Sequence, residues 1–265
     1  MKAFVTGASS GIGYEIAKYL SELGYDIIAV ARNRSGLSRL RKEAKTVVDT
    51  YSVDLSSEQN CIDLFNRVAR EDIDVVVNDA GFGLFGDFSE TSLERELQMI
   101  RTNISALHIL TKLFLEKMVK EDKGYIMNVS SLTGFVPGPR MAAYFASKAY
   151  VTRLTQAIQE ELAKQRSNVH VCVLCPTAVS TNFENVAGVR FGVPHQCPDY
   201  VAKYAVDSML QKKKIILPGC DAKAVRVLSK MLPDSLGAKA AGAALHPKDK
   251  EEARRVEYLS PFNII

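Results

Sequence analysis

A tyrosine and a lysine stand four positions apart in the segment AYFASKAY, residues 143–150. On a helix, side chains at positions i and i+4 meet on one face, so Tyr144 and Lys148 are expected to lie side by side. A free phenol has a pKa of about 10 and is a poor proton donor or acceptor at neutral pH, whereas a neighbouring ammonium favours the phenolate. The pair could therefore act as a general acid and base. Taken alone, this spacing is more often a solvated helix face.

A second chemical feature is the glycine-rich segment TGASSGIG, residues 6–13, which lies between an apolar run and a helical pattern. Gly7, Gly11 and Gly13 stand where a chain must turn tightly, let a phosphate approach its backbone and pack a helix on a sheet. The first amides of that helix are unpaired and carry positive partial charge, so they favour an anion. Between a first strand and a first helix, this density of glycine favours dinucleotide binding over a simple turn.

The segment AVARNR, at the end of the second predicted strand, indicates which dinucleotide is bound. A ribose 2′-hydroxyl is usually held by an acidic residue near this place, whereas a 2′-phosphate needs a cation. Ala31 and Arg32 offer no carboxylate and one guanidinium. The sequence therefore favours NADP(H), with NAD(H) as the alternative, and the predicted chemistry needs no metal.

Apolar runs of strand length alternate with amphipathic helical patterns along the chain. Seven strands are predicted, at residues 2–6, 26–31, 46–53, 74–78, 124–130, 169–175 and 214–218. Helices are predicted between them, at residues 12–23, 35–45, 57–70, 92–120, 142–165 and 198–212. Several strands are apolar almost throughout, as expected when helices cover both faces of a parallel sheet. The alternation predicts an α/β fold with a Rossmann-like, doubly wound, mostly seven-stranded parallel sheet.

The chain shows no internal repeat and no low-complexity linker, which predicts a single domain over residues 1–265. Residues 182–200 follow a strand end and contain glycine, proline and polar residues, a composition typical of a substrate lid. Residues 219–265 form a C-terminal extension that reads as weakly helical and then charged.

Composition and charge exclude several function classes. A formal net charge of +4 over 265 residues is too mild to indicate nucleic-acid binding. The chain has no run of eighteen apolar residues, and its first strand begins at Lys2, which leaves no room for a signal peptide. Five cysteines form no disulfide framework, and the odd separation of Cys172 and Cys175 on a strand puts their thiols on opposite faces. These features predict a soluble, cytoplasmic protein without an integral membrane segment.

Taken together, the motifs resemble those of the short-chain dehydrogenases/reductases, from residue 3 to about residue 218. That family carries T-G-x-x-x-G-x-G, N-N-A-G, a serine after the fifth strand and Y-x-x-x-K. This chain has, in the same order, TGASSGIG, NDAG at 78–81, NVSS at 128–131 and YFASK at 144–148. The resemblance implies an NADP(H)-dependent carbonyl reductase or alcohol dehydrogenase that moves hydride between the nicotinamide and a ketone or secondary alcohol. Phe183 and Phe191 in the predicted lid suggest an apolar substrate, such as a 3-oxoacyl compound, a steroid or another ketone.

Matching positions carry the site residues of the family over to this chain. The resemblance implies that Tyr144 exchanges the proton, that Lys148 lowers the pKa of the phenol and holds the nicotinamide ribose, and that Ser131 hydrogen-bonds the substrate oxygen. It also implies that Asn103 relays protons through water toward the lysine and that Asp54 fixes the adenine end. The other expected cofactor-binding residues are Gly7, Ser9, Ser10, Gly11, Ile12, Gly13, Arg32, Leu55, Asn78, Ala80, Gly81, Val179 and Thr181.

Two positions depart from the family pattern. Asp79 replaces the second asparagine of N-N-A-G and is expected to alter hydrogen bonding at the strand edge without removing a catalytic group. Thr177 stands where the family has glycine and is expected to reshape the nicotinamide pocket.

Two other interpretations can be weighed against this one. Sugar-nucleotide epimerases and dehydratases share Y-x-x-x-K, but their glycine-rich loop is T-G-x-x-G-x-x-G and they need a sizeable C-terminal domain. The glycines of this chain stand at positions 7, 11 and 13 instead, which disfavours that interpretation. A non-enzymatic, cofactor-binding regulatory protein could use the same fold. Such a protein should have lost a catalytic side chain, but this chain keeps all four expected ones, Asn103, Ser131, Tyr144 and Lys148. By resemblance, the helices at 92–120 and 142–165 would form the contact of a homodimer or homotetramer.

Overall fold

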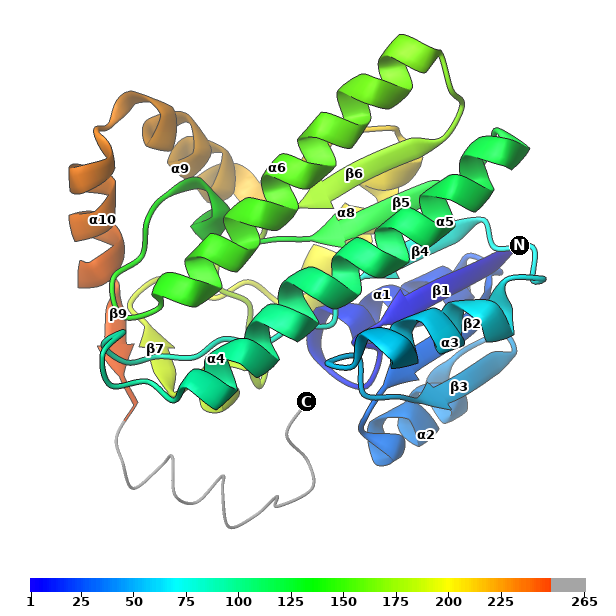
Figure 1. The fold of residues 1–265 in the computed structure, drawn as a ribbon, viewed down its shortest axis with the longest axis horizontal. Helices are drawn as coiled ribbons and strands as arrows, with labels where there is room; N and C mark the ends of the chain where they lie inside the picture. The colour runs from blue at the N-terminus through cyan, green and yellow to red at the C-terminus, as the bar shows by residue number, and fades with distance from the viewer. Residues whose placement is uncertain (249–265) are drawn as a thin grey trace.

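A seven-stranded sheet forms the centre of the structure, a computed structural model that describes residues 1–248 (Figure 1). The strand order is β3-β2-β1-β4-β5-β6-β8, and every pair in it is parallel. The strands are β1 (Lys2–Thr6), β2 (Asp26–Ala31), β3 (Val48–Ser52), β4 (Val75–Asn78), β5 (Tyr125–Val129), β6 (His170–Leu174) and β8 (Ile215–Ile216). This confirms the predicted Rossmann-like, doubly wound fold.

Helices cover both faces of this sheet. One core cluster joins the strands to α1 (Gly11–Glu22), α2 (Arg34–Glu43) and α8 (Pro198–Leu210). The cluster on the other face joins them to α3 (Glu58–Val68), α5 (Leu107–Glu121) and α6 (Ala142–Gln165). Neighbouring strand residues serve opposite faces, because Phe4 belongs to the second cluster and Val5 to the first. The strands are therefore apolar on both sides, and this is why they could be recognised as continuous apolar runs.

The helix predicted over residues 92–120 consists of three consecutive helical segments. These are α4 (Leu93–Ile100), a π-helical stretch (Arg101–Ala106) and α5. Ser92 caps the start of α4 by accepting a hydrogen bond from the Arg95 amide. A π-helical turn holds more residues than an α-helical turn and is frequent at functional sites. Here it contains Asn103, one of the predicted site residues.

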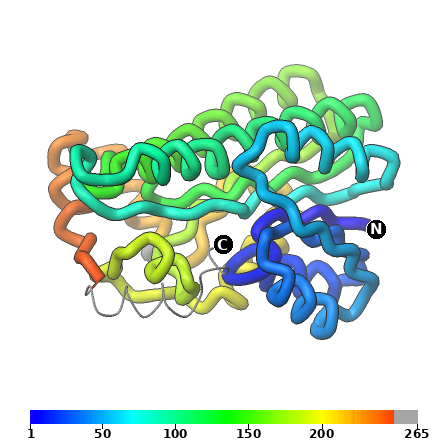
Figure 2. Tube along the Cα trace, turned by 60° about the horizontal axis from the view of Figure 1, so that its bottom comes forward, coloured from blue at the N-terminus to red at the C-terminus, as the bar shows by residue number. Residues whose placement is uncertain are grey.

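The predicted lid is more regular than the sequence suggested. It contains α7 (Phe183–Ala187) and β7 (Val189–Phe191), and β7 pairs antiparallel with β9 (Leu245–Pro247) of the C-terminal extension. The extension also holds α9 (Gly219–Met231) and α10 (Asp234–Ala243), whereas its charged end, residues 249–265, lies outside the described residues. Figure 2 shows these C-terminal helices at the end of the molecule opposite the N-terminus. The strand pair thus joins the extension to the predicted lid.

The cysteine pair behaves as its spacing predicts. Cys172 packs in the cluster that includes α1 and α8, whereas Cys175 packs against Leu107 and Val151 on the other side of the sheet. Burial raises the pKa of the Cys175 thiol to about 12. None of the helices within residues 1–248 is both long and apolar enough to cross a membrane.

Candidate active site

One large cavity lies at the carboxyl ends of the strands, beside the point between β1 and β4 where the strand order reverses. Ligands of parallel α/β sheets bind at such a point. The cavity has a volume of about 1430 Å³, which exceeds the roughly 300–1,000 Å³ of a common small-molecule site and leaves room for two ligands. The predicted site residues that line it are Gly7, Ser9, Ser10, Gly11, Ile12, Arg32, Asp54, Leu55, Ala80, Gly81, Ser131, Tyr144, Lys148, Val179 and Thr181.

The glycine-rich loop packs too closely on its neighbours to carry side chains at two positions. Gly7 has a φ of +72°, and a Cβ atom there would lie 3.0 Å from the amide nitrogen of Ala80. A Cβ atom at Gly13 would lie 2.5 Å from Oδ2 of Asp79 and 2.8 Å from the carbonyl oxygen of Gly7. The side chain of Ser10 caps no amide at the start of α1. The loop and these amides therefore fit the phosphates of a dinucleotide.

Asp79 contributes more than the strand-edge change that was predicted for it. Its Oδ2 atom accepts a hydrogen bond of 2.9 Å from the amide of Gly13, and its own amide donates to Oγ1 of Thr6 at 3.0 Å. Burial raises the pKa of the Asp79 carboxyl to about 6, against the opposing effects of Lys148 and of the Gly13 amide. Asp79 therefore places a titratable carboxyl between the glycine-rich loop and the lysine.

Tyr144, Lys148 and Ser131 come together on the other side of the cavity. Tyr144 and Lys148 are buried on one face of α6, with the lysine Nζ 5.8 Å from the centre of the tyrosine ring. That Nζ donates a hydrogen bond of 3.0 Å to the carbonyl oxygen of Val129, at the end of β5. Ser131 follows two residues later, and its Oγ accepts from the amide of Thr133 at 3.2 Å. The three predicted catalytic side chains on α6 and after β5 thus share one wall.

The pKa values of this group differ from the expectation. Burial raises the pKa of the Tyr144 phenol above its usual value; the Ser131 hydroxyl opposes this shift, and the charge of Asp79 adds to it. Burial also lowers the pKa of Lys148 to about 8, although Asp79 favours its charged form. The phenol pKa as a whole is therefore raised and not lowered as predicted, because the effect of burial is the largest. At neutral pH, the site holds a neutral phenol beside an ammonium.

Three predicted site residues lie behind the cavity wall instead of lining it. Gly13 packs α1 on the strand ends, and the Asn78 amide donates to side chains on α5 and β5 within the core. The side-chain amide of Asn103 accepts from the Phe82 amide at 3.0 Å and donates to the Phe82 carbonyl at 2.9 Å. The side chain of Asn103 therefore anchors the loop after Gly81 instead of facing the cavity as the expected relay.

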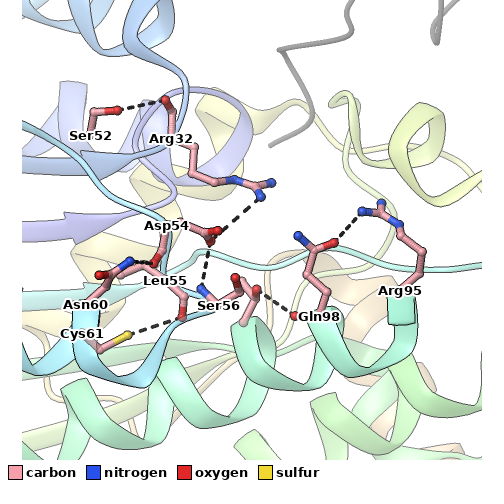
Figure 3. Close-up of polar contacts among 10 residues, drawn as sticks. Arg32, Ser52, Asp54, Leu55, Ser56, Asn60, Cys61, Arg95 and Gln98 are labelled. Carbon is pink, nitrogen blue, oxygen red and sulfur yellow. Dashed lines mark hydrogen bonds and ion pairs between the residues drawn. The ribbon is translucent and has the colours of Figure 1, made fainter. Parts of the chain in front are cut away.

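At the other end of the cavity, Arg32 lies beside Asp54 (Figure 3). Nη1 of Arg32 is 4.0 Å from Oδ1 of Asp54, and this carboxylate oxygen also accepts from the Ser56 amide at 3.0 Å. The sequence assigned Arg32 to the 2′-phosphate and Asp54 to the adenine, two groups of the adenosine half of the cofactor. The structure places both charges at the same end of the cavity.

Sequence reasoning found one part of the wall around Tyr144 and missed the rest. The predicted lid residues Phe183 and Phe191 do lie there, because the Phe183 ring is 5.2 Å from the Tyr144 ring and Phe191 stacks on Phe183 at 6.0 Å. The missed apolar lining comes from the loop after Gly81, from α6 and from the extension, and includes Phe82, Leu84, Phe85, Phe145, Val225, Leu228, Ala241 and Leu245. Only the density of phenylalanine, leucine and glycine in GFGLFG, residues 81–86, could have suggested that this loop borders a ligand.

A buried hydroxyl in this wall remains available to a ligand. It is Oγ1 of Thr177, which has no hydrogen-bond partner among the described side chains and backbone of residues 1–248. Thr177 lines the cavity, where its substitution for glycine was expected to act. Buried polar groups are normally paired, so this hydroxyl fits a polar ligand.

Comparison with known proteins identifies the family. The family model described as short chain dehydrogenase matches residues 1–188. An uncharacterised oxidoreductase of Staphylococcus epidermidis is 37% identical over 193 residues, which cover 72% of this chain and 82% of the relative. A solved short-chain dehydrogenase from Sphingobium yanoikuyae, in complex with NADPH, is 27% identical with a TM-score of 0.76, covering 88% of this chain and 97% of that one. The bulky-bulky ketone specific alcohol dehydrogenase from Comamonas testosteroni is 25% identical with a TM-score of 0.73, covering 88% and 95%.

These matches agree with the strand order, with the glycine-rich loop at the sheet reversal and with the tyrosine and lysine on α6. The resemblance found in the motifs is therefore confirmed, and the chain belongs to the short-chain dehydrogenases/reductases, a family of oxidoreductases.

Proposed function

We propose that the protein is an NADP(H)-dependent carbonyl reductase that reduces apolar ketones, with Tyr144 as the proton donor. The observation that carries this proposal is the placement of Tyr144, whose phenol is buried beside Lys148 in an apolar wall of a cavity with room for two ligands. A phenol in this place can supply the proton that reduction of a carbonyl requires.

The dinucleotide would be held by the glycine-rich loop, by Arg32 and Asp54 and by the Ala80–Gly81 backbone. Lys148 would contact its ribose. When bound, the nicotinamide supplies the hydride to the carbonyl carbon. Negative charge then builds on the carbonyl oxygen, where the hydroxyls of Ser131 and Tyr144 stabilise it. Tyr144 transfers its proton to that oxygen, and the ammonium of Lys148 stabilises the phenolate that remains.

The substrate side of the cavity supports an apolar ketone. The part of the cavity next to Tyr144 is lined by the rings of Phe183 and Phe191 and by the C-terminal helices α9 and α10. The Comamonas relative is specific for bulky-bulky ketones. We further propose that residues 182–200 act as a lid, and that the outer faces of α4, α5 and α6 form a homodimer or homotetramer contact.

A panel of ketones graded by size tests this function. With NADPH present, we expect turnover, followed as loss of NADPH absorbance, to be highest with ketones that carry large apolar groups on both sides. If the protein binds NADPH and reduces no ketone of the panel, the proposal fails, and a regulatory cofactor-binding protein becomes the better interpretation.

Replacing Arg32 with aspartate is expected to weaken NADPH binding by roughly tenfold or more, because a charge-assisted contact is lost and a second carboxylate is added beside Asp54. NADH affinity should change much less, because NADH carries no 2′-phosphate. Fluorescence titration of both dinucleotides measures the ratio. An unchanged NADPH affinity would contradict the assignment of this end of the cavity.

Replacing Asp79 with asparagine removes a charge with little change of shape. Because the Asp79 carboxylate raises the pKa of Lys148, the variant should have a Lys148 pKa lower than about 8. If catalysis needs the ammonium, activity will then be lost at a lower pH than in the wild type, so the alkaline limb of the profile of kcat/KM moves toward lower pH. An alkaline limb that stays in place would show that Asp79 does not influence Lys148.

A further inference from the structure

Arg95 is a cation in the cavity wall that none of the roles above uses. It lies in the first turn of α4, is half-buried and lines the cavity. Its guanidinium carbon is 5.1 Å from the ring centre of Phe82, and its Nη1 lies 2.6 Å from Oε1 of Gln98. Figure 3 shows Arg95 and Gln98 projecting from the helix on the side where Arg32 and Asp54 also lie. An aromatic face and an amide therefore hold the guanidinium at the wall.

The charge of Arg95 is not neutralised within the part of the chain that the structure describes. Arg32 has Asp54 within 4.0 Å and Lys148 is influenced by Asp79, but no carboxylate among residues 1–248 forms an ion pair with Arg95. A guanidinium offers five N–H donors in a planar fork, of which Gln98 occupies one. A half-buried cation whose other N–H donors can still form hydrogen bonds is suited to bind an anionic oxygen group.

Phe82 links Arg95 to the apolar cluster around Tyr144. The Phe82 ring packs in the same apolar cluster as Tyr144, and its backbone is held on both sides by the Asn103 amide. The guanidinium thus lies against a member of the apolar cluster that contains Tyr144. Both residues line the same cavity, so a ligand in it can meet Tyr144 with one polar group and Arg95 with another.

We propose that Arg95 binds an anionic oxygen group of a ligand in this cavity, which is either an acidic group on the carbonyl substrate or a phosphate of the dinucleotide. The inference rests on the proposed function. It makes the specificity more precise, because a neutral, wholly apolar ketone would leave this cation without an anionic partner when the phosphates of the dinucleotide lie elsewhere.

The test compares Arg95→Gln and Arg95→Lys with Arg101→Gln, which removes an exposed arginine from the π-helical stretch of the same long helix. In the substrate arm, kcat/KM is measured for a ketone with a terminal carboxylate and for its methyl ester. In the cofactor arm, the Kd values of NADPH and NADH are measured by fluorescence titration without substrate. Thermal unfolding verifies that the variants are folded.

If Arg95 binds an acidic group of the substrate, Arg95→Gln should lower kcat/KM for the ketone with the terminal carboxylate by roughly 10- to 100-fold, because a charge-assisted contact is lost. The ester should be unaffected, and Arg95→Lys should recover part of the loss. A phosphate as the ligand predicts instead a roughly tenfold or larger rise in the Kd of the dinucleotide. The inference is overturned if neither quantity changes, or if acid and ester decline equally while dinucleotide binding stays the same. Wild-type turnover of the ester tests the proposed function separately, and the cofactor arm needs no turnover.

Discussion

Replacing Tyr144 with phenylalanine is expected to lower kcat for ketone reduction by roughly 10²- to 10⁴-fold, the usual contribution of a general acid. The variant keeps the ring that packs against Phe183, so the apolar wall should remain intact. It loses the proton donor and one of the two hydroxyls that stabilise charge on the carbonyl oxygen. Dinucleotide affinity should stay close to that of the wild type, because Lys148 and the glycine-rich loop are unchanged.

Tyr150→Phe is the matched control for this experiment. Tyr150 lies on the same helix, but its side chain is exposed, and its hydroxyl is 2.7 Å from Nδ1 of His108 at the surface. Deleting this hydroxyl should leave kcat unchanged. If Tyr144→Phe also reduces ketones at the wild-type rate, the phenol is not the proton donor and the proposed mechanism fails. A parallel loss in both variants would point to damage of α6 instead.

The sheet could be predicted from sequence because its strands are buried on both faces. The segments KAFVT and DIIAVA give β1 and β2 with the bounds that were predicted, and α6 spans the predicted residues 142–165. The π-helical stretch around Asn103 could not be predicted, because its residues continue the helical pattern and the extra residue per turn leaves no mark in composition. The β7–β9 pair was missed for another reason. It joins two short segments more than fifty residues apart, and neither segment carries a local sequence pattern that indicates its partner.

The candidate site also has some features that could be predicted from sequence and others that could not. Motifs made of nearly consecutive residues, such as the glycine-rich loop and the pair on α6, could be assigned from sequence because they occur together in the order typical of the family. Contacts between distant segments could not, and the bond between Asp79 and Gly13 joins residues 66 positions apart. The direction of the Tyr144 pKa shift was wrong because it depends on how deeply the whole wall is buried, which the spacing of two residues does not reveal. Arg95 was missed because a single arginine in a helical pattern resembles any surface cation.

Replacing Gly13 with alanine is expected to lower both stability and turnover, although Gly13 does not line the cavity itself. The new Cβ would lie 2.5 Å from Oδ2 of Asp79 and 2.8 Å from the carbonyl oxygen of Gly7, so the loop, Asp79 or α1 must move. Overpacking of this kind costs about 1–3 kcal/mol of the free energy of unfolding. Displacement of either the glycine-rich loop or the carboxyl that influences Lys148 should affect turnover, because a misplacement of about 1 Å can lower turnover by roughly 100-fold.

Gly242→Ala separates this effect from the general consequence of adding a methyl group to a helical glycine. Gly242 lies in the last turn of α10, and a Cβ there would meet its nearest neighbour, Cγ of Pro139, at an ordinary 3.5 Å. That variant should be neutral or more stable by up to about 1 kcal/mol, because alanine favours helix over glycine. Chemical denaturation and NADPH titration measure both variants. If Gly13→Ala matches Gly242→Ala in stability and retains wild-type NADPH affinity, the loop has room that the structure does not show, and the dinucleotide does not depend on this close packing of α1 against β4.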